Sequence, residues 1–144
     1  MTPITVVIAD REKASRAACL RLLRPEKGIR VVGEARSGLE AIAAAKLKPR
    51  ILLLDVHMAA GNGVALLRIL RQKSPRTKVI LLTRRASQAR ILDVLAHGAR
   101  GYLDKKAFRT FLLPKAVRLV DAGQAWVPRK MVAKILDRLA HLTA

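Results

Sequence analysis

The chain has 144 residues, of which 51% are hydrophobic and 29 are lysine or arginine, against only 10 aspartates and glutamates. This length suits one domain with a core large enough to fold unaided. No apolar run reaches the roughly 18 residues of a membrane helix and no signal peptide precedes the first strand, so no membrane association is predicted. The single cysteine, Cys19, rules out an internal disulfide and suits a cytoplasmic, reducing location.

The net charge of +19 would attract nucleic acid or an anionic membrane through non-specific electrostatics. However, the basic residues are scattered along the chain, and aromatic residues, which would stack on single strands, make up only 3%. The pattern favours a solvated basic surface. Direct nucleic-acid binding remains an alternative that rests on charge alone.

Apolar runs and helical periodicities alternate along the chain. In order, they predict strand 4–9, helix 13–24, strand 29–35, helix 37–47, strand 51–54, helix 64–73, strand 78–82, helix 86–97, strand 101–103 and helix 113–122. Ser37 and Glu40 have the spacing of a capping box, and Gly98 and Gly123 follow predicted helix ends. Five strands alternating with five helices predict an α/β fold: a flavodoxin-like, doubly wound, five-stranded parallel sheet of order 2-1-3-4-5.

Residues 124–144 follow this repeat as a short extended piece and an extra C-terminal amphipathic helix, 129–142. Its apolar stripe is too exposed to stand alone and consists of Met131, Val132, Ile135, Leu136, Leu139 and Leu142. We expect the stripe to be covered by its own domain or by a second copy. A homodimer through this helix or through helix 114–122 is therefore predicted.

Polar residues stand where predicted strands end. Asp10 follows the first strand, Asp55 the third and Thr83 the fourth, while Lys105 lies just beyond the fifth. Because parallel strands direct their carboxyl ends to one edge, these four residues should meet in the crevice where such sheets bind ligands. A carboxylate held rigidly at a strand tip suits a nucleophile or a metal ligand.

The segments VVIAD, LLLDVHMAAGNG, VILLT and GARGYLDK occur in the order and at the spacing found in response-regulator receiver domains, which residues 4–122 resemble. The segment AGQAWVPRK, followed by a helix, resembles the linker of NarL/FixJ (LuxR-type) regulators. The resemblance implies a two-component signalling protein that is not an enzyme, with a sensor histidine kinase as partner. It also implies a receiver domain at 1–123, a linker and helix at 124–144, and contact with DNA only through an output domain absent from this sequence.

By this resemblance, Asp55 accepts a phosphoryl group, with Lys105 supplying a cation and Thr83 a hydrogen bond. An aspartate can attack phosphorus if the phosphoryl charge is neutralised. Tyr102 matches the aromatic switch residue of the family, although half-buried packing explains it equally well. Mg²⁺ would be held by Asp10, Asp55 and the backbone carbonyl of His57, while the imidazole of His57 is expected in solvent.

The sequence departs from the family at Arg11, where a second acidic residue normally serves as a metal ligand. We expect the Arg11 guanidinium to enter the pocket and pair with Asp55 or Asp10, unless it swings out to solvent, so Mg²⁺ binding would be weak or absent. Glu12 could rotate in as a substitute ligand, but it is one position later and is expected to point elsewhere. Ala59 replaces a proline and affects only loop stiffness.

Two alternatives follow from these departures. One is an atypical receiver, or pseudo-receiver, that acts as a phosphorylation-independent protein-interaction module. The other is a haloacid-dehalogenase-type phosphatase, which ranks low because such enzymes need a second aspartate where this sequence has His57.

Overall fold

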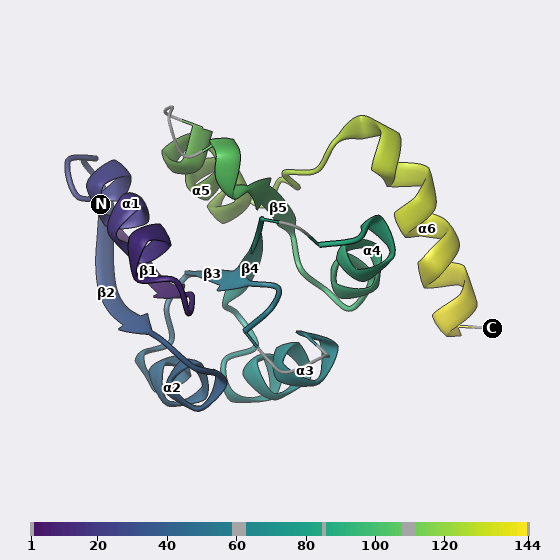
Figure 1. Cartoon of the computed structure of the whole chain (residues 1–144), viewed down its shortest axis with the longest axis horizontal. Helices are drawn as coiled ribbons and strands as arrows, with labels where there is room; N and C mark the ends of the chain where they lie inside the picture. Colours follow the sequence, from purple (N-terminus) through teal and green to yellow (C-terminus); the bar gives the residue numbers. More distant parts are fainter. Residues whose placement is uncertain (1, 59–62, 85, 108–111, 144) are drawn as a thin grey trace.

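The computed structural model describes residues 2–58, 63–84, 86–107 and 112–143, which fold around a central parallel sheet (Figure 1). The strands are β1 (Ile4–Ala9), β2 (Ile29–Ala35), β3 (Ile51–Asp55), β4 (Lys78–Thr83) and β5 (Gly101–Asp104). They pair in the order β2-β1-β3-β4-β5, all parallel. This topology confirms the predicted flavodoxin-like sheet and brings the carboxyl ends of β1 and β3 together at its centre.

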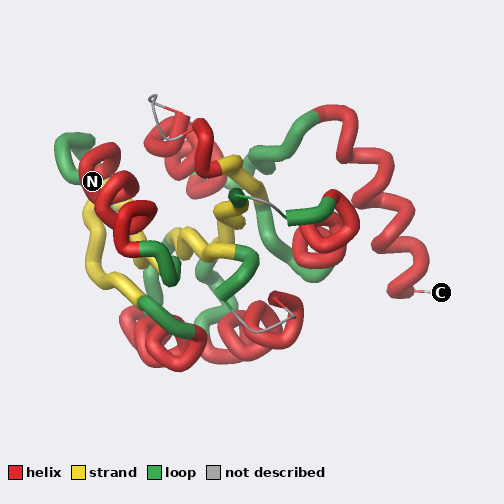
Figure 2. Tube along the Cα trace, viewed as in Figure 1, coloured by secondary structure: helices red, strands yellow, loops and turns green. Residues whose placement is uncertain are grey.

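Helices cover both faces of the sheet. Helices α1 (Lys13–Leu23) and α5 (Leu112–Asp121) lie on one face, and α2 (Gly38–Ala44), α3 (Gly63–Lys73) and α4 (Gln88–Ala96) lie on the other (Figure 1). Helix α6 (Arg129–Thr143) lies outside α4, as the red tubes of Figure 2 show. Within the described ranges, no helix combines the length and the apolar content that crossing a bilayer requires.

The alternation of strand side chains divides the hydrophobic core into two layers. Val7, Leu52 and Leu81 point toward α2, α3 and α4, whereas their neighbours in sequence point toward α1 and α5. The second layer includes Ile8, Leu53, Ile80 and the buried Cys19. Because both faces are covered, the central strands read as continuous apolar runs, which is why they were recognisable in the sequence.

Several predicted helix ends differ from the observed ones for local reasons. The predicted helix 37–47 is α-helical only to Ala44 and tightens into a 3₁₀ turn, η1 (Ala45–Leu47). At its start, Ser37 Oγ accepts a hydrogen bond from Glu40 N at 3.2 Å, but Glu40 Oε1 accepts one from Arg36 N instead of Ser37 N. Only half of the predicted capping box therefore forms.

Helix α4 starts two residues later than predicted because Ser87 caps it, accepting a hydrogen bond from Arg90 N at 3.2 Å. Helix α5 accommodates Pro114 in its first turn, where a missing N–H does no harm.

The C-terminal segment is tied to the domain at two places. Trp126 makes a parallel bridge beside β5, in which Tyr102 N donates to Trp126 O and Trp126 N donates to Arg100 O, each at 3.0 Å. Beyond it, α6 packs on α4 and buries Met131, which is 2% exposed. The predicted apolar stripe is thus covered on one side by its own domain, whereas Leu136 remains 60% exposed.

Candidate functional site

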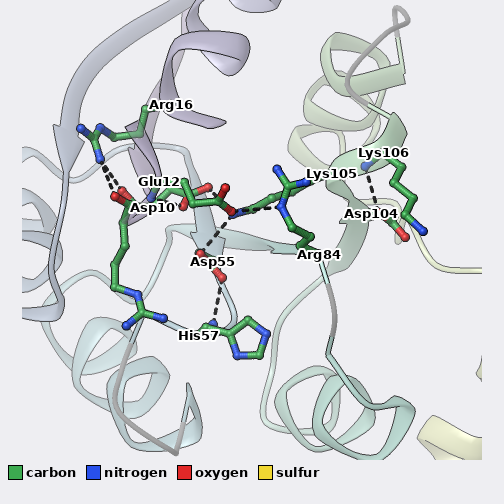
Figure 3. Close-up of polar contacts among 10 residues, drawn as sticks. Asp10, Glu12, Arg16, Asp55, His57, Arg84, Asp104, Lys105 and Lys106 are labelled. Atoms are coloured by element: carbon green, nitrogen blue, oxygen red, sulfur yellow. Dashed lines mark hydrogen bonds and ion pairs between the residues drawn. The ribbon is translucent and has the colours of Figure 1, made fainter. Parts of the chain in front are cut away.

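The four strand-tip residues predicted to meet are all buried at the carboxyl edge of the sheet. Asp10 is 0% exposed, Asp55 and Thr83 are each 4% exposed, and Lys105 is 6% exposed. Asp55 ends β3, and Thr83 ends β4, opposite Asp104 of β5. Lys105 begins the 3₁₀ turn η2 (Lys105–Ala107) directly after β5. The sheet register therefore positions these side chains, as Figure 3 shows for Asp10, Asp55 and Lys105.

Lys105 is the centre of the site, because its ammonium group contacts three carboxylates. Its Nζ lies 2.8 Å from Asp10 Oδ2, 2.8 Å from Glu12 Oε1 and 3.1 Å from Asp55 Oδ2. Burial alone would lower the pKa of Lys105, but the hydrogen bonds with Asp10 and Glu12 and the charge of Asp55 raise it above the ordinary value. The ammonium is therefore charged and held in place at neutral pH.

The two buried aspartates respond differently to this environment. Burial raises the pKa of Asp55, and the neighbouring Asp10 adds to the rise despite the His57 N–H and the Lys105 charge. For Asp10, burial acts in the same direction, but hydrogen bonds from Lys105 and from the backbone N–H of Glu12 lower its pKa. Asp10 is thus the fixed anion of the pair. Asp55 is the more basic carboxylate, and its Oδ1 accepts a hydrogen bond from His57 N at 2.9 Å.

Glu12 belongs to the site, contrary to the expectation that it would point elsewhere. Its backbone N–H donates to Asp10 Oδ1 at 2.9 Å, which turns the chain so that the Glu12 side chain reaches Lys105. Arg84, directly after Thr83, contacts the same Glu12 oxygen at 3.3 Å (Figure 3). The hydrogen bond from Lys105 lowers the pKa of Glu12. The alternating acids of Asp10-Arg11-Glu12 were the signal in the sequence for this arrangement.

Arg11 does not form the ion pair expected of it. The residue is exposed, and its guanidinium has no ion pair with any residue of the part of the chain that the structure describes. The expected pairing with Asp55 or Asp10 is therefore wrong for this conformation, which is instead the solvent-facing one. A different arginine supports the site: the buried Arg16 donates from Nη1 to the carbonyl oxygen of Asp10 at 2.7 Å.

The remaining predicted residues surround this cluster. His57 is half-buried, and its Nδ1 lies 2.9 Å from Arg90 Nη1. Because a guanidinium can only donate, this nitrogen is the acceptor and the imidazole is not simply in solvent as expected. Tyr102 is half-buried against the layer that contains α4. Ala59 lies outside the described residues.

The acidic cluster meets the basic requirements of a divalent-cation site. Asp10, Glu12 and Asp55 each offer an oxygen, and these oxygens lie within 4.8 Å of one another. Mg²⁺ binds oxygen at about 2.0–2.1 Å, so opposite ligands stand roughly 4.2 Å apart, and small rotations would bring the carboxylates into range. Lys105 contacts all three groups, so a bound cation would share these anions with its ammonium.

Comparison with known proteins agrees with this geometry. The family model described as "Response regulator receiver domain" matches residues 6–118. The transcriptional regulatory protein LnrK of Bacillus subtilis is 33% identical over 135 residues, covering 93% of this chain and 61% of that protein. The DNA-binding transcriptional activator DevR/DosR of Mycobacterium tuberculosis is 31% identical over 137 residues, which cover 94% of this chain and 63% of that protein. The chain thus spans less than two thirds of the length of these relatives.

Solved structures show the same fold. The signal receiver domain of the putative response regulator NarL from Mycobacterium tuberculosis has a TM-score of 0.77 at 28% identity, covering 86% of this chain and 100% of that one. The isolated receiver domain of RcsB from Salmonella enterica in the apo form has a TM-score of 0.79 at 26% identity, and the match covers 93% of this chain and 98% of that one. From the matched family model, the relatives and the strand-tip geometry, we conclude that the chain belongs to the response regulator receiver domain family, with relatives among the NarL/LuxR-type regulators of two-component systems.

Proposed function

We propose that this receiver domain accepts a phosphoryl group on Asp55 from a sensor histidine kinase and thereby controls dimerisation and transcriptional output. The observation that carries the proposal is the Lys105 ammonium joining Asp10 and Asp55 at the tips of β1 and β3. A carboxylate with a raised pKa is a better nucleophile, and a fixed neighbouring cation offsets the charge of the incoming phosphoryl group.

In the proposed reaction, a carboxylate oxygen of Asp55 attacks phosphorus, and the bond from phosphorus to the donor histidine nitrogen breaks. The nitrogen leaves with the electron pair of that bond. Lys105, already 3.1 Å from Asp55 Oδ2, then contacts a phosphoryl oxygen, and the Thr83 hydroxyl donates a hydrogen bond to another. Arg84 is beside them and adds a further cation. Tyr102 is the proposed switch residue.

Bound Mg²⁺ would neutralise phosphoryl charge, and this chain offers Asp10, Asp55 and the His57 backbone carbonyl to hold it. Glu12 stands in for the acid that Arg11 replaces. Three carboxylates face two paired cations, Lys105 and Arg84, and Arg11 adds a third positive charge nearby. We therefore propose that the metal site exists but is weakened, because the pocket has little net negative charge left.

Labelling with a small phosphodonor such as acetyl phosphate tests the phosphoacceptor. Wild type should gain the mass of one phosphoryl group in the presence of Mg²⁺, and Asp55→Asn should gain none. The matched control is Asp104→Asn, since Asp104 also stands at a strand tip but accepts from Lys106 N at 2.9 Å and points away from the site (Figure 3). Labelling of Asp55→Asn equal to that of wild type would overturn the proposal.

The alternative function is a phosphorylation-independent interaction module. It is favoured by one observation: Glu12 and Arg84 already close a network around Lys105 without a phosphoryl group. If wild type stays unlabelled at millimolar Mg²⁺ while Arg11→Asp becomes labelled, this alternative replaces the first proposal.

We propose that α6 forms the dimer interface. The side of the helix that faces away from α4 exposes Val132 (43%) and Leu136 (60%), which are one helical turn apart. A second copy would cover them. Sedimentation of the chain ending at Gly123 tests this, because an unchanged oligomeric state would remove α6 from the interface.

The division into a receiver at 1–123 and a linker with α6 at 124–144 is also a proposal. Because the relatives extend well beyond the matched part, we propose that DNA is contacted only by a C-terminal output domain joined to α6. A DNA-binding assay comparing this chain with its continuation, if the natural reading frame extends past Ala144, checks it.

A further inference from the structure

A cavity of about 460 Å³ opens at the edge of the sheet opposite the carboxylates. It lies between the loop of residues 48–50 before β3 and the segment 73–76, which is the last residue of α3 and the loop that leads to β4. Both loops carry a proline followed by an arginine, Pro49-Arg50 and Pro75-Arg76. The sheet topology brings the loops together, because β3 and β4 are paired neighbours.

Hydrogen bonds hold the two loops in a fixed relation. Thr77 Oγ1 donates to the Pro49 carbonyl at 2.6 Å and shares a hydrogen bond with Ser74 Oγ. Lys78 N donates to the Arg50 carbonyl at 3.0 Å. The Arg50 guanidinium is held by both Asp121 oxygens, at 2.8 and 2.7 Å. The cavity is therefore built on an ordered base, which lowers the entropy cost of binding a ligand there.

The charge around the cavity is unbalanced. Lys48, Arg50, Lys73 and Arg76 line it, and no acidic side chain does. Asp121 offsets Arg50, but for Lys48, Lys73 and Arg76 no ion pair is found among the residues that the structure describes. A helix C-terminus favours a cation, which accounts for Lys73 at the end of α3. Lys48 likewise follows the C-terminus of η1, and Arg50 is paired with Asp121, so Arg76 is the cation that neither a helix end nor an ion pair among the described residues explains.

Lys48 has a backbone conformation that is uncommon for lysine. Its φ of 47° makes it the only non-glycine residue with positive φ in the described part of the chain. A glycine at this position, after η1, would avoid the steric cost that lysine incurs there. A left-handed residue commonly ends a helix, so this conformation is the C-terminal cap of η1 and is not in itself a sign of binding.

We propose that this cavity binds a small anion carrying two or more phosphate groups, such as pyrophosphate or the polyphosphate of a nucleotide. Its volume lies in the usual range for small-ligand pockets. Basic residues from two segments of the chain line it, which suits an anion with two phosphate groups, and Arg76 offers a fork that matches phosphate oxygens. An extended nucleic-acid backbone would need the cations spread along a ridge, whereas these residues line one hollow.

Isothermal titration of the full chain with inorganic pyrophosphate, at low and at physiological salt, tests the proposal. Wild type should bind pyrophosphate at least tenfold more tightly than orthophosphate. Lys73→Gln/Arg76→Gln should weaken pyrophosphate binding about tenfold or more, since two of the cations are removed. Lys48→Gly removes a third cation while relieving the backbone, so it should bind more weakly yet unfold at a higher temperature.

The matched control is Arg129→Gln/Lys130→Gln, which removes two exposed charges from α6 and changes the net charge equally. It should bind pyrophosphate as wild type does. Equal weakening by both double variants would overturn the proposal, because it would show attraction to the overall charge of +19. A random-sequence DNA duplex that competes as well as pyrophosphate per phosphate group would also overturn it, in favour of a non-specific polyanion surface.

Discussion

Replacing Glu12 by glutamine should weaken Mg²⁺ binding substantially. The substitution keeps the size of the side chain but removes one of the three carboxylates whose oxygens lie within 4.8 Å of one another. Because the structure shows Arg11 exposed and Glu12 at the site, Glu12 and not Arg11 is the residue whose charge the metal would meet directly.

The magnitude follows from Coulomb attraction. A divalent cation about 4 Å from a carboxylate gains roughly 2 kcal/mol at the dielectric constant of water, and a direct ligand is closer, so this value is a minimum. The lower dielectric constant of a protein interior would give several times more, but the Glu12 side chain is 42% exposed, so the water value is the appropriate one. A loss of about 2 kcal/mol corresponds to roughly thirty-fold weaker binding.

Isothermal titration with Mg²⁺, without any phosphodonor, measures this directly. Asp137→Asn on α6 is the matched control, since it removes an exposed carboxylate far from the site. Arg11→Asp should act in the opposite direction, because it removes a positive charge and adds a carboxylate beside Asp10. If Glu12→Gln binds Mg²⁺ as tightly as wild type and the control, Glu12 is not a ligand and the argument from the three-carboxylate cluster fails.

Three further predictions concern burial. Lys105→Met should cost about 3–5 kcal/mol of unfolding free energy at neutral pH, because it leaves buried carboxylates unpaired. The pKa values of Asp10 and Glu12 are lowered from 3.8 and 4.5, so the stabilisation by Lys105 is present above those values and is lost in acid. Urea unfolding should therefore show the cost of the substitution shrinking below about pH 4.5. Burial raises the pKa of Cys19 to about 12 from 9.0, so its thiol should react with a disulfide reagent at pH 8 only as fast as the domain opens, and rapid labelling without urea would contradict its burial. Met131→Ala should lower the free energy of unfolding by about 2–5 kcal/mol, because Met131 is buried. Leu136→Gln should change it by less than about 0.5 kcal/mol, because Leu136 is exposed, yet should weaken dimerisation. Urea unfolding measures the first effect and sedimentation the second.

The sequence determined the sheet and most of its helices, because each is encoded by local periodicity. Continuous apolar runs such as 51–54 identify strands covered on both faces, and the alternation of strands with helices leaves few topologies. The strand-tip positions of Asp10, Asp55, Thr83 and Lys105 follow from that topology alone. Helix ends were less certain: η1 departs from the predicted helix because a tighter terminal turn satisfies the last carbonyls, and no residue pattern distinguishes the two.

Only the tertiary structure decided how charges pair. Arg11 and Glu12 are adjacent in sequence, but only the Glu12 side chain enters the site. One cause is local, the hydrogen bond from Glu12 N to Asp10 Oδ1. The other is the position of Lys105 and Arg84, which are 93 and 72 residues away from Glu12. The packing of Met131 against α4 and the convergence of Lys48 with Arg76 depend in the same way on elements distant in sequence. Periodicity reports which face of an element is buried, whereas an ion pair or a cavity is a relation between elements and exists only once they are packed.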